Sequence, residues 1–358
     1  MESFDVNKPL PQSIALKSID NHLYRIGLSL ISKNDEKRSR FYNPLLILIV
    51  NIICLIKCIV SLILSEENEK LLIINGDFAH FLRSKTHLNV AAFLAFLSAL
   101  IQQLIYYYNS KSNINPKYVK VYDMMSGLVS PKSIGLTNGE EIYKLIKQSK
   151  LWFSFCRCNI QIIVPVSCLS TSLLPFVLNC SALDTIIFGI PHSLLYAIGS
   201  HYVATIGVWQ IFYFLLICRY IKIKFKESND FVSQLIFRRK LIKWEQVLRI
   251  IWNLDAKYSE LEKYNQEFWS KYLLSIWLIL GTLVNFSLYH LFFAEMTAIL
   301  KLMTGYGATF AFLAFLFVIT NASSVNYEAN KMYKLLNHIM VYNRLSRLRF
   351  STKIKVKN

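Results

Sequence analysis

The sequence predicts an all-α membrane protein: a polytopic bundle of about six transmembrane helices with extended cytoplasmic helices. Only 17% of its 358 residues are charged, whereas 54% are hydrophobic; soluble proteins carry about 25% charged residues. The charged residues are concentrated in a few stretches. Between these stretches lie apolar runs of roughly 20 residues, the length that crosses the hydrocarbon core of a bilayer.

The predicted spans differ in their polar content. The first contains one lysine, Lys57, and the second ends in three tyrosines of the kind found at a membrane interface. The third contains Arg157 near its start and Pro165 and Pro175 farther along, which lipid-embedded helices tolerate. The last three are apolar with scattered polar residues. We predict spans near 44–64, 87–108, 153–178, 193–218, 272–295 and 305–320.

These spans divide the chain into three parts. Residues 1–43 form a polar N-terminal segment that lacks the short apolar core of a signal peptide. Residues 44–321 form the transmembrane bundle, which includes helical cytoplasmic loops at 109–152 and 219–271. Residues 322–358 form a cytoplasmic amphipathic segment.

Lys and Arg outside the spans alternate between crowded and nearly empty segments. The N-terminal segment holds seven, and the first three loops hold three, seven and none. The fourth loop is the most basic, the fifth holds one, and the C-terminal segment holds eight. This alternation follows the positive-inside rule for cytoplasmic N- and C-termini. The net charge of +18 is therefore a topology signal, and we expect a lipid bilayer as partner and no nucleic acid.

A glycosylation sequon at Asn179 agrees with this orientation, because its loop is predicted to lie outside the cell. Further sequons begin at Asn285 and Asn321, but the first falls within a span and the second on the cytoplasmic side. Asn179 is therefore the predicted glycosylation site. The alternative is a chance match, since such tripeptides are common.

The basic fourth loop is predicted to be helical. Between Leu235 and Leu261, apolar residues recur at spacings of three, four and seven, and charged residues occupy the other positions. We expect helices four and five to continue into the cytoplasm and to pack together there. The alternative is an amphipathic segment that lies on the inner leaflet.

No pattern in the sequence predicts catalysis. Most of the seven cysteines lie in apolar runs, and their spacing completes no set of four zinc ligands, so we interpret them as small residues of helix packing. The sequence has no acid–base pair, activated nucleophile, metal cluster or phosphate-binding glycine loop. We therefore expect no enzyme activity, no metal and no cofactor.

Polar residues inside the spans are functional candidates, because ionisable groups are costly there. Lys57 lies close enough to the outer end of its helix to extend toward Glu66 and Glu67. Six aromatic or histidine residues in the outer helix halves are predicted to line a pocket for a small organic ligand. They are Tyr196, His201, Tyr202, Tyr289, His290 and Tyr306. The alternative is that they anchor the helix ends at the interface.

The stretch after the sixth span is the most distinctive part of the sequence. It reads TNASSVNYEAN from Thr320 and continues as KMYKLLN to Asn337. It resembles the segment after the sixth span in the arthropod gustatory and odorant receptor superfamily, where a small residue, a Val and a Glu-Ala pair lead into a Leu-containing amphipathic helix. The cytoplasmic N-terminus, the long second and fourth cytoplasmic loops and the many Tyr and Phe residues extend the resemblance over most of the chain.

The resemblance implies a subunit of a ligand-gated cation channel in the plasma membrane that detects tastants or odorants as a tetramer with identical or related subunits. It places Val325, Glu328, Ala329 and Leu336 in a shared cytoplasmic anchor. The alternative is a juxtamembrane amphipathic helix whose Val and Leu pack inward. The family has a seventh, pore-lining span, which we expect to be missing here, so the resemblance assigns no pore residue.

Three other interpretations stay open. A G-protein-coupled receptor has an outside N-terminus and seven spans, and the charge pattern opposes both. A secondary transporter has internal repeats or helices broken near the midplane; no repeat is apparent, but Pro165 and Pro175 are compatible with a break. The third interpretation is a truncated receptor that folds without conducting ions.

Overall fold

The apolar runs of the sequence fold as helices. The computed structural model describes residues 5–11, 44–64, 67–77, 85–111, 118–177, 181–237, 244–266, 270, 274–293 and 298–355, and within them no strand occurs. The longer helices are α2 (Pro44–Ile63), α4 (Lys85–Lys111), α6 (Gly139–Val177), α8 (Ile190–Phe237), α9 (Trp244–Tyr264), α10 (Leu274–Phe293) and α11 (Ala298–Lys355). The shorter elements are α3 (Glu69–Asn75), α5 (Tyr118–Met125), the 3-10 turn η2 (Pro131–Ile134), α7 (Ala182–Asp184) and the π-helical turn η3 (Thr185–Gly189).

Three helical segments are long and apolar enough to cross a membrane. They are Leu45–Ile63, Ala182–Phe237 and Thr304–Val341, and two shorter apolar segments are Leu88–Leu104 and Leu280–Phe293. These five segments overlap five of the six predicted spans. The remaining predicted span lies in α6, where the side chains of residues 163–177 are outside the described part, and the described remainder of α6 is not among the five. The chain is therefore a helical protein with several segments suited to a membrane.

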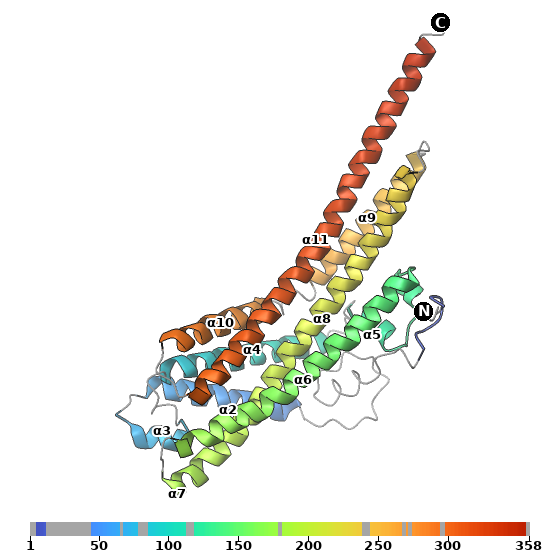
Figure 1. The fold of residues 1–358 in the computed structure, drawn as a ribbon. Helices are drawn as coiled ribbons and strands as arrows, with labels where there is room; N and C mark the ends of the chain where they lie inside the picture. The colour runs from blue at the N-terminus through green and yellow to red at the C-terminus, as the bar shows by residue number, and fades with distance from the viewer. Residues whose placement is uncertain are drawn as a thin grey trace.

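The long helices α6, α8 and α11 lie side by side and form the long axis of the molecule (Figure 1). α2, α4 and α10 lie beside one half of these helices, and α9 lies beside the other half (Figure 1). We call the end of the bundle that holds α3 and α7 the α3 end, and the opposite end the α9 end.

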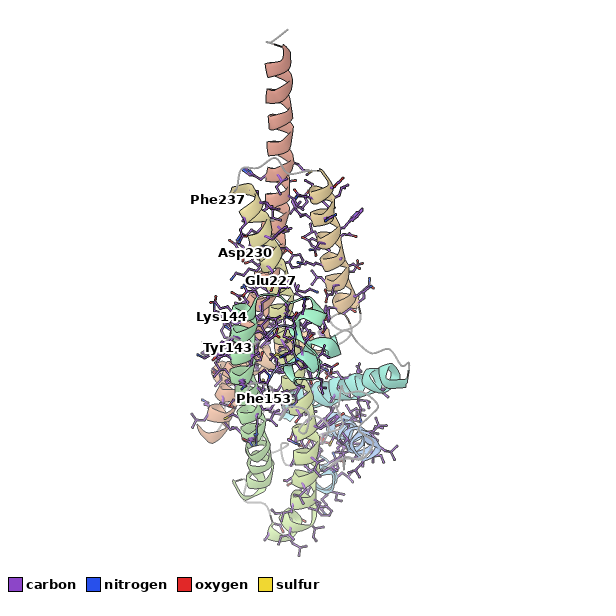
Figure 2. All side chains as sticks on the ribbon, turned by 90° about the vertical axis from the view of Figure 1, so that its right-hand side faces the viewer. Tyr143, Lys144, Phe153, Glu227, Asp230 and Phe237 are labelled. Carbon is purple, nitrogen blue, oxygen red and sulfur yellow. The ribbon has the colours of Figure 1, made fainter. Side chains whose placement is uncertain are left out.

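The long helices are continuous where the sequence suggested boundaries. α6 runs through Pro165 and Pro175 without interruption. α8 continues beyond the fourth predicted span to Phe237, which confirms that helix four is extended (Figure 2). α11 passes from the sixth predicted span to Lys355 without a break, so the predicted boundary at residue 321 is not a structural one. The reason is that neither Gly nor Pro occurs between Gly307 and Lys355.

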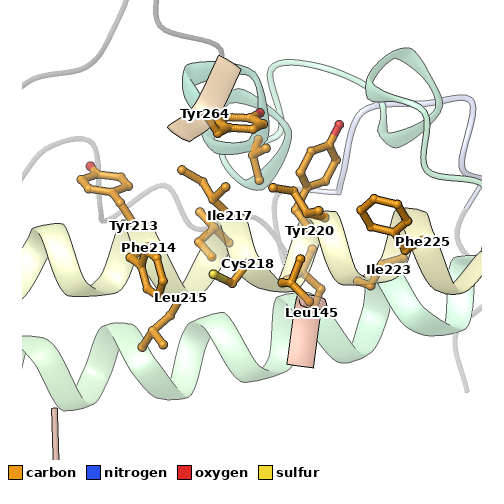
Figure 3. Close-up of a cluster of buried hydrophobic side chains, with 14 of the residues drawn as sticks. Leu145, Tyr213, Phe214, Leu215, Ile217, Cys218, Tyr220, Ile223, Phe225 and Tyr264 are labelled. Atoms are coloured by element: carbon orange, nitrogen blue, oxygen red, sulfur yellow. The ribbon is translucent and has the colours of Figure 1, made fainter. Parts of the chain in front are cut away.

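The main hydrophobic core surrounds α8. Most α8 side chains from Val208 to Phe225 are buried, and Figure 3 shows Leu145 of α6 and Tyr264 of α9 next to them. The apolar face of α9 joins the same core through Val247, Ile250 and Leu254. α9 therefore packs against the protein, as the first of the two interpretations of the fourth loop predicts. Residues 238–243 of that loop lie outside the described residues.

A second, smaller core joins α2, α4 and the start of α8. It consists of Val50, Cys54, Leu55, Cys58 and Phe96. The helices approach closely at Gly199, where an added Cβ would lie 2.6 Å from a ring carbon of Phe96 and 3.3 Å from Sγ of Cys54. Two cysteines of this core, like Cys156 and Cys218 in the main core, are small residues in helix packing, as predicted.

Candidate functional site

Polar side chains from α2, α3 and α8 meet at the α3 end of the bundle. Nζ of Lys57 lies 2.6 Å from the carbonyl oxygen of Asn75 and 3.3 Å from Nδ1 of His192. The side-chain amide of Asn75 donates hydrogen bonds to the Lys57 carbonyl oxygen at 3.0 Å and to the Ser61 hydroxyl at 2.9 Å. α3 is thus tied to the last two turns of α2 by reciprocal hydrogen bonds.

Tyr196 lies one turn beyond His192 on α8 and extends this group toward α2 and α4. Its hydroxyl lies 3.0 Å from Sγ of Cys58. Its ring packs edge-on against Phe96, with 5.3 Å between the ring centroids, and lies 4.7 Å from the ring of His192. We call Lys57, Cys58, Asn75, His192 and Tyr196 the α3-end cluster.

Gly76 allows the close approach of α3 to α8. Its φ of +78° lies in the left-handed region, where a side chain causes strain. A Cβ at this position would lie 2.5 Å from Cγ of His192. The next residue, Asp77, is buried and accepts a hydrogen bond of 2.9 Å from Asn89 of α4. The sequence Asn-Gly-Asp therefore connects α3 to three other helices.

The α3-end cluster combines one cation with neutral hydrogen-bonding groups and an aromatic wall. The two hydrogen-bonding partners of Lys57 are the Asn75 carbonyl and His192, so Lys57 does not extend toward Glu66 and Glu67 as predicted from the sequence; Glu66 itself lies outside the described residues. The ammonium group of Lys57 is instead hydrogen-bonded to the Asn75 carbonyl oxygen of α3 and lies close to the His192 imidazole of α8. The hydrogen bonds therefore run among the members of the cluster itself.

The six residues that the sequence assigned to one ligand pocket lie on α8, α10 and α11. Tyr196 belongs to the α3-end cluster, and His201 and Tyr202 follow it along α8. The other three are on α10 and α11. The Tyr306 hydroxyl donates a hydrogen bond of 3.0 Å to Oδ1 of Asn159 on α6.

The two residues on α10 differ in their surroundings. His290 is buried, whereas Tyr289 is 47% exposed and its ring packs on Phe293 of the same helix. α10 packs against α4 and α11. Tyr196 and Tyr306 thus contact different helices, and the shared pocket stays a prediction.

Sequence reasoning did not find His192, Asn75 or Asp77. Two signals pointed to them. An ionisable residue within a span, Lys57, needs a polar partner, and an Asn-Gly-Asp tripeptide between apolar segments is typical of a tight turn. The partners themselves come from segments far along the chain, so they were not evident from the sequence.

Comparisons with protein-family models, with curated proteins and with solved structures give no match to this chain. The resemblance to insect chemoreceptors therefore stays a prediction from the sequence. The predicted glycosylation site at Asn179 lies outside the described residues.

At the α9 end, the four residues that the resemblance assigns to an anchor all face the protein interior. Val325, Glu328, Ala329 and Leu336 are 5%, 8%, 4% and 7% exposed. Their spacings of three, one and seven place them on one side of α11. The side-chain amide of Asn229 on α8 donates hydrogen bonds to the Glu328 carbonyl oxygen at 3.0 Å and to its carboxylate at 2.8 Å. This face of α11 is therefore fixed to α8.

Charged residues join α9 to α8 at the same end. Nζ of Lys224 lies 2.5 Å from the carboxylate of Glu260. The Tyr220 hydroxyl lies 2.9 Å from the same carboxylate and 2.8 Å from the carbonyl oxygen of Ile134. Lys257 donates hydrogen bonds to the Lys224 carbonyl oxygen at 2.7 Å and to the hydroxyl of Ser228. Burial lowers the pKa of Lys257 to about 8, and the charge of Lys224 adds to the decrease.

The start of α6 is held against α8 by two carboxylates. Glu227 accepts hydrogen bonds from the backbone amides of Thr137 at 3.0 Å and Asn138 at 2.8 Å (Figure 2 labels Glu227). Nζ of Lys226 lies 2.7 Å from the carboxylate of Glu141. Burial opposes ionisation of Glu141, but the hydrogen bond and charge of Lys226 outweigh it and lower the pKa of Glu141. The α9 end is therefore a polar, tightly connected assembly of α6, α8, α9 and α11.

Proposed function

We propose that the chain is a chemosensory receptor subunit of the gustatory-receptor type. In this proposal it crosses the plasma membrane six times, with the α9 end in the cytoplasm and the α3 end outside. A small organic ligand binds at the α3 end, and the helices transmit binding to a cytoplasmic anchor that is shared with identical or related subunits. The subunit contributes to a cation channel.

The observation that carries the proposal is the course of α8. This one helix supplies His192 and Tyr196 to the α3-end cluster and Tyr220 and Lys224 to the network at the α9 end. A change at either end of a continuous helix alters the position of the other end. A receptor needs such a connection between its ligand site and its output.

Two further features support the proposal. The positive-inside pattern predicts that the α3 end faces outward, where a tastant or odorant arrives. The unbroken course of α6 through Pro165 and Pro175 favours a receptor over a transporter, whose substrate site is commonly built from broken helices.

Ligand binding to the purified full-length chain tests the proposal. A panel of sugars, amino acids, alkaloids and organic acids is screened for compounds that raise the thermal unfolding midpoint, because a ligand that binds only the folded state stabilises it. The expected result is a compound that stabilises the wild type but not Lys57→Met. Lys70→Met is the matched control, because Lys70 is an exposed lysine on the neighbouring α3.

Calcium imaging completes the test. Cells that carry the full-length chain at their surface, alone and together with a conducting chemoreceptor subunit, are exposed to the compounds found by binding. A calcium signal that Lys57→Met abolishes supports the proposal. A surface-expressed chain that no compound stabilises and that gives no signal in either setting refutes it.

A further inference from the structure

One face of α8 carries a row of cationic and polar side chains just beyond its apolar stretch. Arg219, Lys222, Lys226 and Asn229 follow one another at spacings of three and four, which places them on one side of the helix. The row begins directly after the buried Cys218. It starts at the level where the apolar part of α8 gives way to its charged part.

The row lies in the seam between α6 and α11. Lys226 forms its ion pair with Glu141 of α6, and Asn229 donates its hydrogen bonds to Glu328 of α11. α8 packs along both of these helices. The two members of the row farther from the apolar stretch are thus neutralised or hydrogen-bonded by the neighbouring helices.

The two members nearest the apolar stretch lack such partners. Within the described part of the chain, neither Arg219 nor Lys222 forms an ion pair, and the buried Nε of Arg219 has no hydrogen-bond partner. The positive charges of Arg219 and Lys226 act against that of Lys222, and the carboxylates of Glu328 and Glu141 act in its favour without forming an ion pair with it among the described residues. A buried donor without an acceptor is costly, and two adjacent cations repel.

An anion with several oxygen atoms would remove both costs. The planar guanidinium group binds phosphate through parallel N–H donors, and a lysine adds a point charge. α6 offers a further group: Gln148 lies seven residues beyond Glu141 on the same side of the helix, and its buried Oε1 accepts no hydrogen bond among the described residues. That oxygen suits a hydroxyl group of a ligand.

We propose that Arg219 and Lys222 bind the phosphate of an anionic lipid from the cytoplasmic leaflet, in the seam between α6, α8 and α11. The position favours a lipid because the row begins where the apolar stretch ends, at the depth of the lipid head groups. Basic pockets between transmembrane helices on the cytoplasmic side bind such head groups. A lipid with a hydroxylated head group, such as a phosphoinositide, would also reach Gln148.

The experiment measures lipid binding by the purified full-length chain in neutral detergent. A short-chain phosphoinositide, short-chain phosphatidylcholine, the soluble inositol phosphate head group and inorganic phosphate are each titrated while the unfolding midpoint is recorded. We expect the phosphoinositide alone to raise the midpoint of the wild type. In Arg219→Gln/Lys222→Gln the apparent affinity falls by about tenfold or more, since each basic residue near an anionic lipid contributes appreciably.

Two sets of variants control for charge and folding. Lys331→Gln/Lys334→Gln removes the same charge from exposed positions of α11 and should keep wild-type affinity. Arg219→Lys/Lys222→Arg keeps both charges and should retain most of the binding, which shows that the site tolerates substitution. Each variant is first checked for a monodisperse elution profile.

Three results overturn the proposal. The first is unchanged phosphoinositide binding by Arg219→Gln/Lys222→Gln. The second is an equal loss in Lys331→Gln/Lys334→Gln, which indicates a diffuse attraction to overall charge. The third is an equal midpoint shift with the soluble head group or inorganic phosphate, which indicates a site for a soluble anion. Because none of these readouts involves a tastant, failure here leaves the proposed receptor function unaffected.

Discussion

Replacing Asn229 with alanine removes the polar connection between α8 and α11. Both Asn229 and Glu328 are buried, and the Asn229 amide donates to the Glu328 carbonyl oxygen and carboxylate at 3.0 and 2.8 Å. A hydrogen bond to a charged group contributes about 1.5–3 kcal/mol and one to a neutral group about 1 kcal/mol. The carboxylate would also stay buried without its donor. We therefore expect Asn229→Ala to lower the free energy of unfolding by about 2–4 kcal/mol.

Thermal unfolding of the purified chain in detergent measures this loss. The expected decrease of the apparent midpoint is about 5 °C or more. Because membrane proteins often unfold irreversibly, all variants are heated at one scan rate. Asn330→Ala is the control, since Asn330 is exposed on the same helix and its side-chain amide donates to Asn326 in the preceding turn of that helix. We expect the control to match the wild type within about 1 °C.

A third variant separates the loss of hydrogen bonds from the loss of charge. Glu328→Gln keeps a side-chain oxygen that accepts from Asn229, so its midpoint should fall between those of Asn229→Ala and the wild type. The reasoning is refuted if Asn229→Ala and Asn330→Ala unfold at the same temperature. It is also refuted if Glu328→Gln loses more stability than Asn229→Ala.

Three other predictions concern α3, α9 and the topology. Gly76→Ala should destabilise the chain by about 1–3 kcal/mol, because its φ of +78° and the approach to His192 exclude a Cβ; Gly207→Ala, with nothing within 4 Å, should leave the midpoint unchanged or slightly higher. The folded chain lowers the pKa of Lys257 from its usual 10.5 to about 8, so the unfolded chain binds more protons between these pH values and stability should rise across this interval. Lys257→Met should lack that rise, and equal pH profiles would contradict the assignment. Finally, endoglycosidase treatment should lower the apparent electrophoretic mass of the wild type produced in eukaryotic cells, but not that of Asn179→Gln. An unchanged mass of the treated wild type argues against an outside loop at this position.

The helices were predictable from the sequence because their signals are local. A run of apolar residues defines a helix such as α2 regardless of what it contacts. The spacing of Val247, Ile250 and Leu254 defines the buried face of α9 in the same way. The burial of Val325 and Leu336 also follows from spacing along one helix. The absence of Gly and Pro explains why α11 is longer than its predicted span, and counting these residues would have shown this.

The partners of individual polar residues were not predictable, because they depend on how helices pack. Lys57 was expected to extend toward the nearest carboxylates in the chain, but it contacts His192, which is 135 positions away. The different partners of Tyr196 and Tyr306 were not predictable for the same reason. Both lie on helices whose aromatic residues look equivalent in sequence, yet one contacts α2 and α4 and the other contacts α6.

The uninterrupted length of α8 has a mechanical consequence. Its 48 residues form a rod of roughly 70 Å at 1.5 Å per residue. A tilt of about 5° around the middle of such a rod displaces each tip by roughly 3 Å, about the length of one hydrogen bond. Gly76 lies against His192 near one end of the rod, and Glu260 pairs with Lys224 in its other half. A tilt of this size would therefore break or make contacts at both ends while α8 stays helical.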